Sequence, residues 1–277
     1  MQLHRPCPPL DRYIEGLWHA DLRVTYRREK ILPSPRLELI INFGAPFLLE
    51  RHVHESAMVC TDAWLVGLQT GPLVNEPLAE TLMIGVRFRP GGQQPFFNLP
   101  ASDFTDSVVP LDDLWGAFAA EARERLASLQ TVRERFLLLE SLLLRRFRPP
   151  SRALPFVDAA VSAISQVDGA LSIRGLAGEL GVSQKHLAAQ FRATVGLSPK
   201  ALARTYRLQA VLQTIDPLAS VDWARVAQDA QFYDQSHFNH EFSAFTGLSP
   251  GEYLRLRRVL YGATFEPGED VHFVPLG

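Results

Sequence analysis

The pattern of apolar and polar positions changes partway along the chain. Between residues 18 and 88, short apolar segments such as 37–43 (LELIINF) and 82–88 (LMIGVRF) are separated by turns rich in Pro and Gly. Such segments are typical of antiparallel strands. The pattern therefore predicts a β-sandwich or barrel in this part of the chain.

Helical spacing of apolar residues begins after the Pro-Gly-Gly turn at 90–92. It predicts one helix over residues 111–129 and a second from Thr131 to about Phe147, which opens with a capping-box sequence, TVRE. Residues 148–151 (RPPS) then interrupt the pattern. Because consecutive prolines remove helix donors and hold the chain extended, we interpret this segment as a linker between domains.

The last third of the chain contains an internal repeat. The sequence GLSP at 196–199 recurs 51 residues later, at 247–250. At the same offset of 51, Phe191 matches Phe242 and His186 matches His237. Nearer the start of each copy the matching residues are 50 apart, so the second copy has one extra residue in its turn. We name residues 173–199 the first repeat and residues 223–250 the second repeat.

Each repeat has the parts of a helix-turn-helix. Ser183 and Asp234 end the short turns and can cap the second helix of each repeat. Apolar residues one helical turn apart give each second helix a stripe that can pack on its own domain, which leaves the opposite face free. The outward rows are Lys185, Ala189 and Arg192 in the first repeat, and Ser236, His240 and Ser243 in the second.

Two interpretations of the repeat compete. Helix-turn-helix units also occur outside DNA binding, so the repeat could stack two packing units in a helical interaction module. Lys185 and Arg192 would then be solvated charges, and His186 and His237 structural groups. The duplication favours DNA binding, because two such helices on one chain can enter successive major grooves about 34 Å apart.

The DNA-binding interpretation gives each candidate residue a role. Lys185 and Arg192 can donate to guanine or phosphate, Gln184 can contact adenine, and Ala188 and Ala189 suit a thymine methyl group. The second repeat offers mainly neutral donors and acceptors, and two cations just after the first repeat are candidates for phosphate contacts. The predicted DNA-binding residues are Ser183, Gln184, Lys185, His186, Ala188, Ala189, Arg192, Lys200, Arg204, Gln235, Ser236, His237, Asn239 and His240.

The C-terminal part resembles the DNA-binding domain of AraC/XylS-family regulators. The resemblance covers residues 155–258 and rests on LAGELGVSQKHLAAQFRATVGLSP and ARVAQDAQFYDQSHFNHEFSAFTGLSPGEYLRLR. It implies seven helices, with a long one from Pro199 to about Gln213 joining the two repeats. Gln231 departs from the family pattern, which usually has a turn glycine at this position.

The N-terminal part is similar to the cupin-like sensor domains of AraC-type regulators. The residues that carry this resemblance are LPSPRLELIINFG, GLQTGP and GVRFRPGG. It implies a small β-barrel that senses a small molecule or dimerises, without naming the ligand. We therefore also expect a ligand cavity within the β-rich domain.

These patterns together predict an α+β multidomain chain. A β-rich, cupin-like barrel with a helical connector is expected to precede an all-α double helix-turn-helix domain. The expected ranges are 1–110 for the sensor domain, 111–148 for the connector, 149–154 for the linker, 155–260 for the DNA-binding domain and 261–277 for a C-terminal tail.

Composition limits the function classes. The net charge of −2 over 277 residues argues against binding nucleic acid with the whole surface, although residues 151–260 carry 11 Lys and Arg against 9 Asp and Glu. The N-terminus lacks the apolar core of a signal peptide, and no apolar run approaches the roughly 18 residues of a membrane span. We therefore expect a cytoplasmic protein that does not contact membranes.

We expect no catalytic residues, no metal and no cofactor. His52 and His54 flank Val53 as metal-binding histidines of cupins do, but no later histidine in the barrel supplies a distant ligand. Cys60 has no activating motif beside it, and two cysteines cannot form a disulfide framework. The competing hypothesis is a cupin-type metal-dependent enzyme fused to a DNA-binding tail.

The expected partners are double-stranded DNA, a small-molecule effector and a second copy of the chain, with RNA polymerase as a further candidate. An apolar row on the helix after Thr131 is the predicted dimer contact, with packing inside the domain as the alternative. The row comprises Val132, Phe136, Leu139 and Leu143. The operator, the effector and the direction of regulation stay open.

Overall fold

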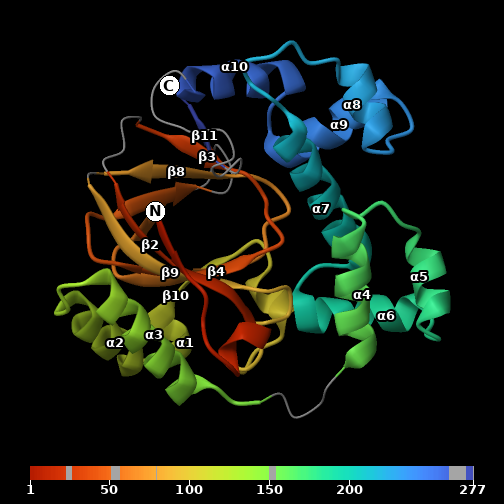
Figure 1. The fold of residues 1–277 in the computed structure, drawn as a ribbon. Helices are drawn as coiled ribbons and strands as arrows, with labels where there is room; N and C mark the ends of the chain where they lie inside the picture. The colour runs from red at the N-terminus through yellow and green to blue at the C-terminus, as the bar shows by residue number, and fades with distance from the viewer. Residues whose placement is uncertain (23–26, 51–56, 79, 150–153, 262–272, 277) are drawn as a thin grey trace.

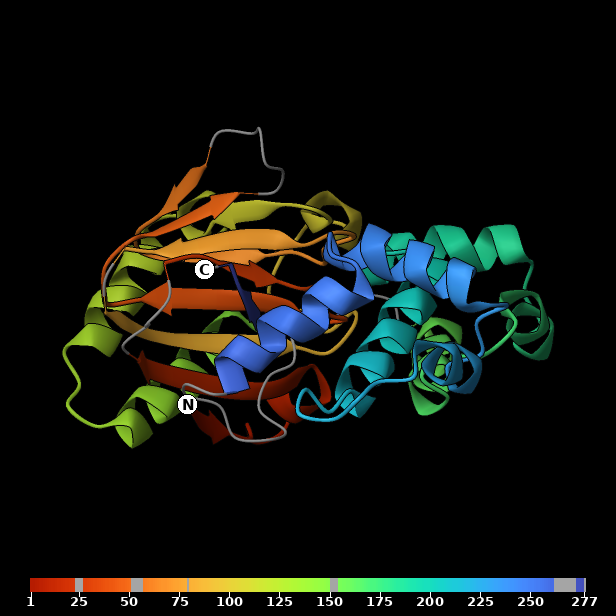
Figure 2. The same ribbon diagram turned by 90° about the horizontal axis from the view of Figure 1, so that it is seen from above.

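The computed structural model describes residues 1–22, 27–50, 57–78, 80–149, 154–261 and 273–276. A β-rich N-terminal part with helices on one side lies next to a helical C-terminal part (Figure 1). Seen from above, the sheets and the C-terminal helices lie side by side (Figure 2). The predicted combination of a β-rich part and a helical part is confirmed.

The described strands form two antiparallel sheets. The six-stranded sheet has the order β1 (Gln2–His4), β2 (Ile14–Leu22), β9 (Thr81–Phe88), β4 (Leu37–Asn42), β7 (Ala63–Val66) and β10 (Val108–Pro110). The five-stranded sheet has the order β11 (Phe273–Pro275), β3 (Glu29–Ile31), β8 (Leu73–Pro77), β5 (Phe47–Glu50) and β6 (Met58–Cys60). Both strands singled out in the sequence are present as β4 and β9.

Large side chains fill the space between the two sheets. Trp18, Trp64 and Met83 come from the six-stranded sheet and pack with Phe47 of the five-stranded sheet. The indole of Trp18 lies directly on Gly85, where an added Cβ would come within 2.3 Å of the ring. A glycine is therefore required in β9 at this point, because any side chain would displace the tryptophan.

Three helices cover the outer face of the six-stranded sheet: α1 (Leu111–Trp115), α2 (Ala117–Ala127) and α3 (Val132–Arg146). The single helix predicted over 111–129 is broken at Gly116, whose φ of 58° lies in the left-handed region. The capping box at the start of α3 is confirmed, since Thr131 Oγ1 accepts from the Glu134 amide at 3.2 Å.

The apolar row predicted for dimerisation lies inside the domain. Phe136, Leu139 and Leu143 are buried against the six-stranded sheet, and Val132 packs at the edge of the same core. The dimer contact predicted for this row is therefore wrong, and the alternative of internal packing holds. A helix that packs on a sheet and a helix that packs on a second subunit both need an apolar row of this spacing. The spacing alone therefore does not distinguish the two arrangements.

Seven helices follow in the described range 154–261. They are α4 (Pro155–Gln166), α5 (Ile173–Glu179), α6 (Gln184–Val195), α7 (Pro199–Thr214), α8 (Trp223–Asp229), α9 (Gln235–Thr246) and α10 (Pro250–Tyr261). The predicted long joining helix is α7, and Figure 1 shows it running from one repeat to the other. Its 16 residues give it a length of about 24 Å.

Each repeat contributes to a core of its own. Leu187 and Phe191 of α6 pack with α4 and α5, and Phe238 and Phe242 of α9 pack with α8 and α10. The linker predicted over 149–154 includes residues 150–153, which lie outside the described residues. The helical part begins at Pro155, the position expected from the sequence.

The end of the chain returns to the β-rich part. Strand β11, within the segment predicted as a tail, pairs with β3 and adds an edge strand to the five-stranded sheet. Val274 is fully buried with the second-repeat core, and Arg257 of α10 donates to the Phe273 carbonyl at 3.0 Å. The last strand therefore connects the second repeat to the N-terminal sheet.

None of the helices in the described ranges has the length and apolarity that crossing a membrane requires.

Candidate DNA-binding interface

The second helix of the first repeat starts at a capped, exposed end. Ser183 Oγ accepts from the His186 amide at 3.2 Å, which satisfies one of the amides left free at the start of α6. Leu187 and Phe191 are fully buried and fix the inner face of the helix. The predicted outward row of Lys185, Ala189 and Arg192 is exposed, and so is Gln184, whereas Ala188 is half-buried.

The second repeat has the same construction. Asp234 Oδ1 accepts from the His237 amide at 2.7 Å, and Phe238 and Phe242 are fully buried. The Trp223 ring stacks on Phe238 with 6.0 Å between ring centroids. Four of the predicted contact residues are exposed, whereas Asn239 and the row member Ser243 are half-buried. The exposed four are Gln235, Ser236, His237 and His240.

The two turns keep one backbone geometry despite the missing glycine. Gly181 has a φ of 68° and Gln231, at the equivalent position, has a φ of 56°. The next residue donates its amide to the preceding helix in both repeats: Val182 to Ala177 at 3.0 Å and Phe232 to Ala227 at 2.9 Å. A non-glycine residue thus occupies the left-handed conformation at a steric cost, without changing the turn.

The extra turn residue of the second repeat is Tyr233. Its side chain is 91% exposed at the start of α9, next to the Asp234 cap. The sequence showed that the second turn has one extra residue, but not that its side chain is exposed. The spacing between matching residues changes from 50 at Phe232 to 51 at Asp234, and this change could have identified the extra residue as Tyr233.

Two of the three predicted contact histidines, His186 and His237, pack against neighbouring aromatic rings. The His186 ring lies 5.5 Å from the Phe156 ring, and the His237 ring lies 5.6 Å from the Phe232 ring. The Tyr233 amide donates to His237 Nδ1 at 3.4 Å. Each ring therefore has a local partner and still stands on the exposed side of its helix.

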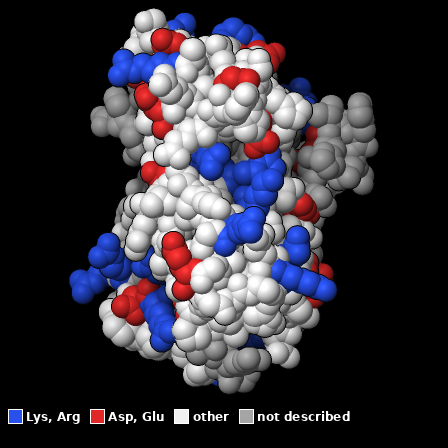
Figure 3. All heavy atoms as spheres, turned by 90° about the vertical axis from the view of Figure 1, so that its right-hand side faces the viewer, with Lys and Arg blue, Asp and Glu red and all other residues white. Residues whose placement is uncertain are grey.

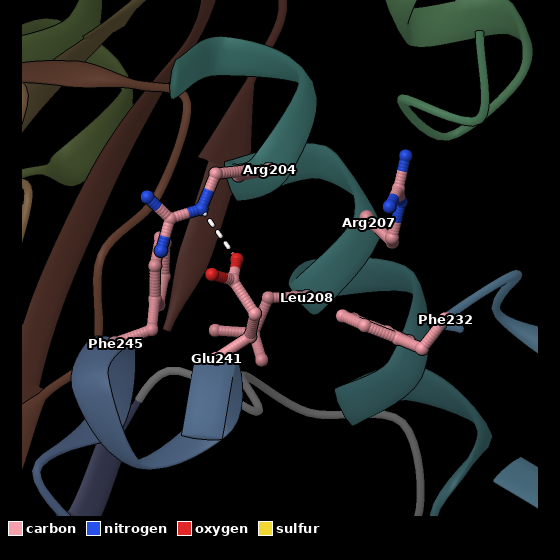
Figure 4. Close-up of a pocket in the computed structure, with 6 residues that line it drawn as sticks. All are labelled: Arg204, Arg207, Leu208, Phe232, Glu241 and Phe245. Carbon is pink, nitrogen blue, oxygen red and sulfur yellow. Dashed lines mark ion pairs between the residues drawn. The ribbon is translucent and has the colours of Figure 1, made fainter. Parts of the chain in front are cut away.

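Helix α7 is tied to the second repeat by charged side chains. Arg204 Nε lies 2.6 Å from Glu241 Oε2 of α9, and the Arg207 guanidinium lies over the Phe232 ring at 5.5 Å (Figure 4). Arg207 also donates to the Gly169 carbonyl at 3.0 Å. The pocket between these side chains measures about 10 Å³, the lower limit for one water molecule.

The ion pair between Arg204 and Glu241 distinguishes the two predicted phosphate contacts, Lys200 and Arg204. The guanidinium of Arg204 is already paired with Glu241, whereas the Lys200 side chain is exposed. Figure 3 looks onto the side of the C-terminal helices, where Lys and Arg side chains gather near the middle of the face. A basic region between the repeats is suited to the phosphates between two major-groove segments.

Both repeats dock on the β-rich part at their C-terminal ends. Gln93 Nε2 donates to the Thr194 carbonyl at 2.9 Å, and Thr105 Oγ1 donates to the Gly196 carbonyl at 2.7 Å. Lys30 Nζ makes the equivalent contact to Gly247 of the second repeat at 2.8 Å. The starts of α6 and α9 are left exposed, so the docking does not cover the predicted contact residues.

Other candidate chemistry gains no support from the described residues. They contain no group of three or more His, Cys, Asp and Glu side chains arranged to hold a metal ion. His52 and His54 lie outside them. Cys60 is buried, and burial raises the pKa of its thiol to about 12, so this cysteine is a weak nucleophile.

Comparisons with known proteins assign the two parts separately. Residues 176–256 match the model of a helix-turn-helix domain, and residues 2–110 match a domain of unknown function, DUF6597. No curated protein sequence gives a significant match to the chain.

Solved structures of regulators are similar to this chain at low sequence identity. ToxT from Vibrio cholerae is 12% identical over 86% of this chain and 98% of ToxT, with a TM-score of 0.46. The C-terminal domain of AraT, a response regulator from Geobacillus stearothermophilus, is 22% identical over 43% of this chain and 95% of that domain, with a TM-score of 0.35. The AraC-like activator CuxR is 16% identical over 76% and 85% of the two chains, with a TM-score of 0.26.

The helix-turn-helix match begins inside α5, at residue 176, and covers the rest of the first repeat, α7 and the second repeat. The motifs, the geometry and this match agree on the same residues. The chain therefore carries a helix-turn-helix domain at residues 176–256, where its sequence resembles the AraC-type regulators, behind an N-terminal domain of unknown function at residues 2–110.

Proposed function

We propose that the chain binds a specific DNA sequence with both repeats, placing α6 and α9 in successive major-groove segments. The observation that carries this proposal is the duplication of one construction: a capped helix, a buried aromatic anchor and an outward row in each repeat, exposed throughout in the first and at Ser236 and His240 in the second. Helix α7 and the Arg204–Glu241 ion pair hold the repeats in one arrangement. A preformed pair of helices loses less entropy on binding than two independent ones.

The two repeats are proposed to contribute differently. In the first, Lys185 and Arg192 bring positive charge to bases or phosphates. In the second, the exposed Gln235 and Ser236 are uncharged hydrogen-bonding groups, so its binding depends less on salt. Lys200 is the stronger candidate for a phosphate contact, because Arg204 already has a carboxylate partner.

The N-terminal part is proposed to regulate DNA binding by sensing a small molecule or by joining two chains. Its direct contacts to both repeats support this role, since a change at either contact reaches a DNA-binding helix. A dimer would use a surface other than the buried row on α3. The mass of the full chain at micromolar concentration measures the oligomeric state.

Selection from fragmented genomic DNA tests sequence-specific binding. The purified full chain should enrich a small set of fragments and bind them at least 1,000-fold more tightly than scrambled DNA of equal length at physiological salt. Equal affinity for enriched and scrambled DNA would contradict the proposal. The genes beside the enriched sites would then show which transcription the chain regulates.

A further inference from the structure

The second helices of the two repeats begin and end at equivalent residues. Helices α6 (Gln184–Val195) and α9 (Gln235–Thr246) each contain 12 residues, and both ends of α9 lie 51 positions after those of α6. The extra residue Tyr233 precedes α9, so it does not shift this register. After both helices a glycine donates its amide to the carbonyl four residues earlier, at 3.0 Å in the first repeat and 2.9 Å in the second. The two helices therefore present equivalent positions in the same way.

Both helices also run in the same direction relative to the β-rich part. The Gly196 carbonyl after α6 accepts from Thr105, and the equivalent Gly247 carbonyl after α9 accepts from Lys30. Figure 1 shows α6 and α9 each running from the outer side of the helical part toward the sheets. The symmetry of an operator mirrors that of the protein that binds it. Two helices with one orientation on one chain therefore favour a direct repeat over a palindrome.

Glutamine occupies the first position of both helices. Gln184 and Gln235 are exposed, and each follows a capping residue whose side-chain oxygen accepts from the amide three residues on. The first residues of a recognition helix contact base edges, and a glutamine amide matches N6 and N7 of adenine. The shared histidines His186 and His237 pack against aromatic rings of their own repeats. We therefore assign the common readout to the glutamines.

The second position differs between the helices. Lys185 in α6 and Ser236 in α9 are both exposed. A lysine donates to O6 and N7 of guanine, whereas a serine hydroxyl bonds to any of several bases. Further along the outward row, the exposed Arg192 corresponds to the half-buried Ser243. The guanine preference of the first helix should therefore have no counterpart in the second.

We propose that the operator of this chain contains an imperfect direct repeat: two segments about 10 base pairs apart with an adenine at the same position of the same strand. The adenines face Gln184 and Gln235, and a guanine beside the adenine in the first segment alone faces Lys185. This inference rests on the proposed function, since it requires both helices in major grooves.

Selection from a library of random duplexes tests this operator pattern. A random region of about 25 base pairs spans two helical turns of DNA. The full chain should enrich two blocks in the same orientation that share the adenine. Blocks in inverted orientation, or unlike bases at the equivalent position, would overturn the inference.

Substitutions assign each base to its side chain. Gln184→Ala should remove the adenine preference from the first block alone, and Gln235→Ala from the second alone. Each change should lower discrimination at its own base pair about five- to 150-fold. Gln130→Ala is the matched control, because Gln130 is exposed between α2 and α3 in the β-rich part. A loss of affinity for all sequences alike would place the glutamines on phosphates and refute the assignment.

An exchange at the second position tests whether the two helices are equivalent. Ser236→Lys gives α9 the residue that α6 has at this position, so it should create a guanine preference in the second block. Lys185→Ser should remove the guanine from the first block. A Ser236→Lys chain that binds all sequences more tightly, without preferring guanine, would contradict the equivalent placement.

The same selection separates this inference from the proposed function. If no sequence is enriched over scrambled DNA, the proposed function fails and the inference fails with it. If the enriched DNA is protected in two major-groove segments that share no adenine, the proposed function stands and the inference alone fails.

Discussion

The contact between the first repeat and the β-rich part rests on two hydrogen bonds that can be removed with little change in shape. Gln93→Met and Thr105→Val delete the donors to the Thr194 and Gly196 carbonyls. Gln93 is only 1% exposed, so water cannot readily replace its bond. An unpaired buried acceptor costs about 1 to 3 kcal/mol, and Thr105 is half-buried. We expect the two changes together to weaken the docking of α6 by about 2 to 4 kcal/mol.

Hydrogen exchange measures this loss where it occurs. Amides over residues 194–197 should exchange about 30-fold faster or more, because local opening follows the free energy of the contact. Thr70→Val is the matched control: its hydroxyl bonds to Asp106 at 2.7 Å and does not touch α6. Unchanged protection in the double variant, or an equal loss in the control, would refute the reasoning.

Three further predictions concern single residues. Gln231→Gly should raise the free energy of unfolding by about 0.5 to 1 kcal/mol in urea titrations, since glycine adopts a φ of 56° without strain; a lower value would contradict this. Iodoacetamide at pH 8 should modify exposed Cys7 but not Cys60, whose pKa of about 12 keeps it a thiol, and mass spectrometry shows which reacts. Burial, then Arg135, lower the pKa of His19 in the folded chain, so below about pH 6.5, the ordinary histidine value, the unfolded chain takes up a proton that the folded chain does not, and the free energy of unfolding falls. His19→Gln should therefore show a smaller fall in unfolding free energy from pH 7 to 5.5, and an equal fall would exclude His19 as the cause.

The double helix-turn-helix could be predicted because its signals are local. A capping residue, a turn and an apolar stripe all lie within a few residues of one another, so Ser183 and Asp234 marked the starts of α6 and α9 correctly. The duplication then reinforced each assignment. The extra residue in the second turn was predicted in the same way, from a change of offset.

Contacts between distant segments left no comparable signal. The bond from Lys30 to Gly247 spans 217 residues, and the pairing of β11 with β3 joins residues 273–275 to residues 29–31. The α3 row shows the same limit: its spacing predicted an apolar face, but not that the six-stranded sheet covers it.

Footprinting on an enriched fragment with Lys185→Ala and His240→Ala chains tests two-groove binding most directly. The natural chain should protect two segments about 10 base pairs apart on one DNA face. Lys185→Ala should weaken one segment and cost about 1 to 3 kcal/mol, and His240→Ala should weaken the other. The exposed Arg133 of α3 supplies a control, Arg133→Ala, that should change neither segment. Loss in the same segment for both variants, or in neither at unchanged affinity, would contradict the assignment of α6 and α9 to separate grooves.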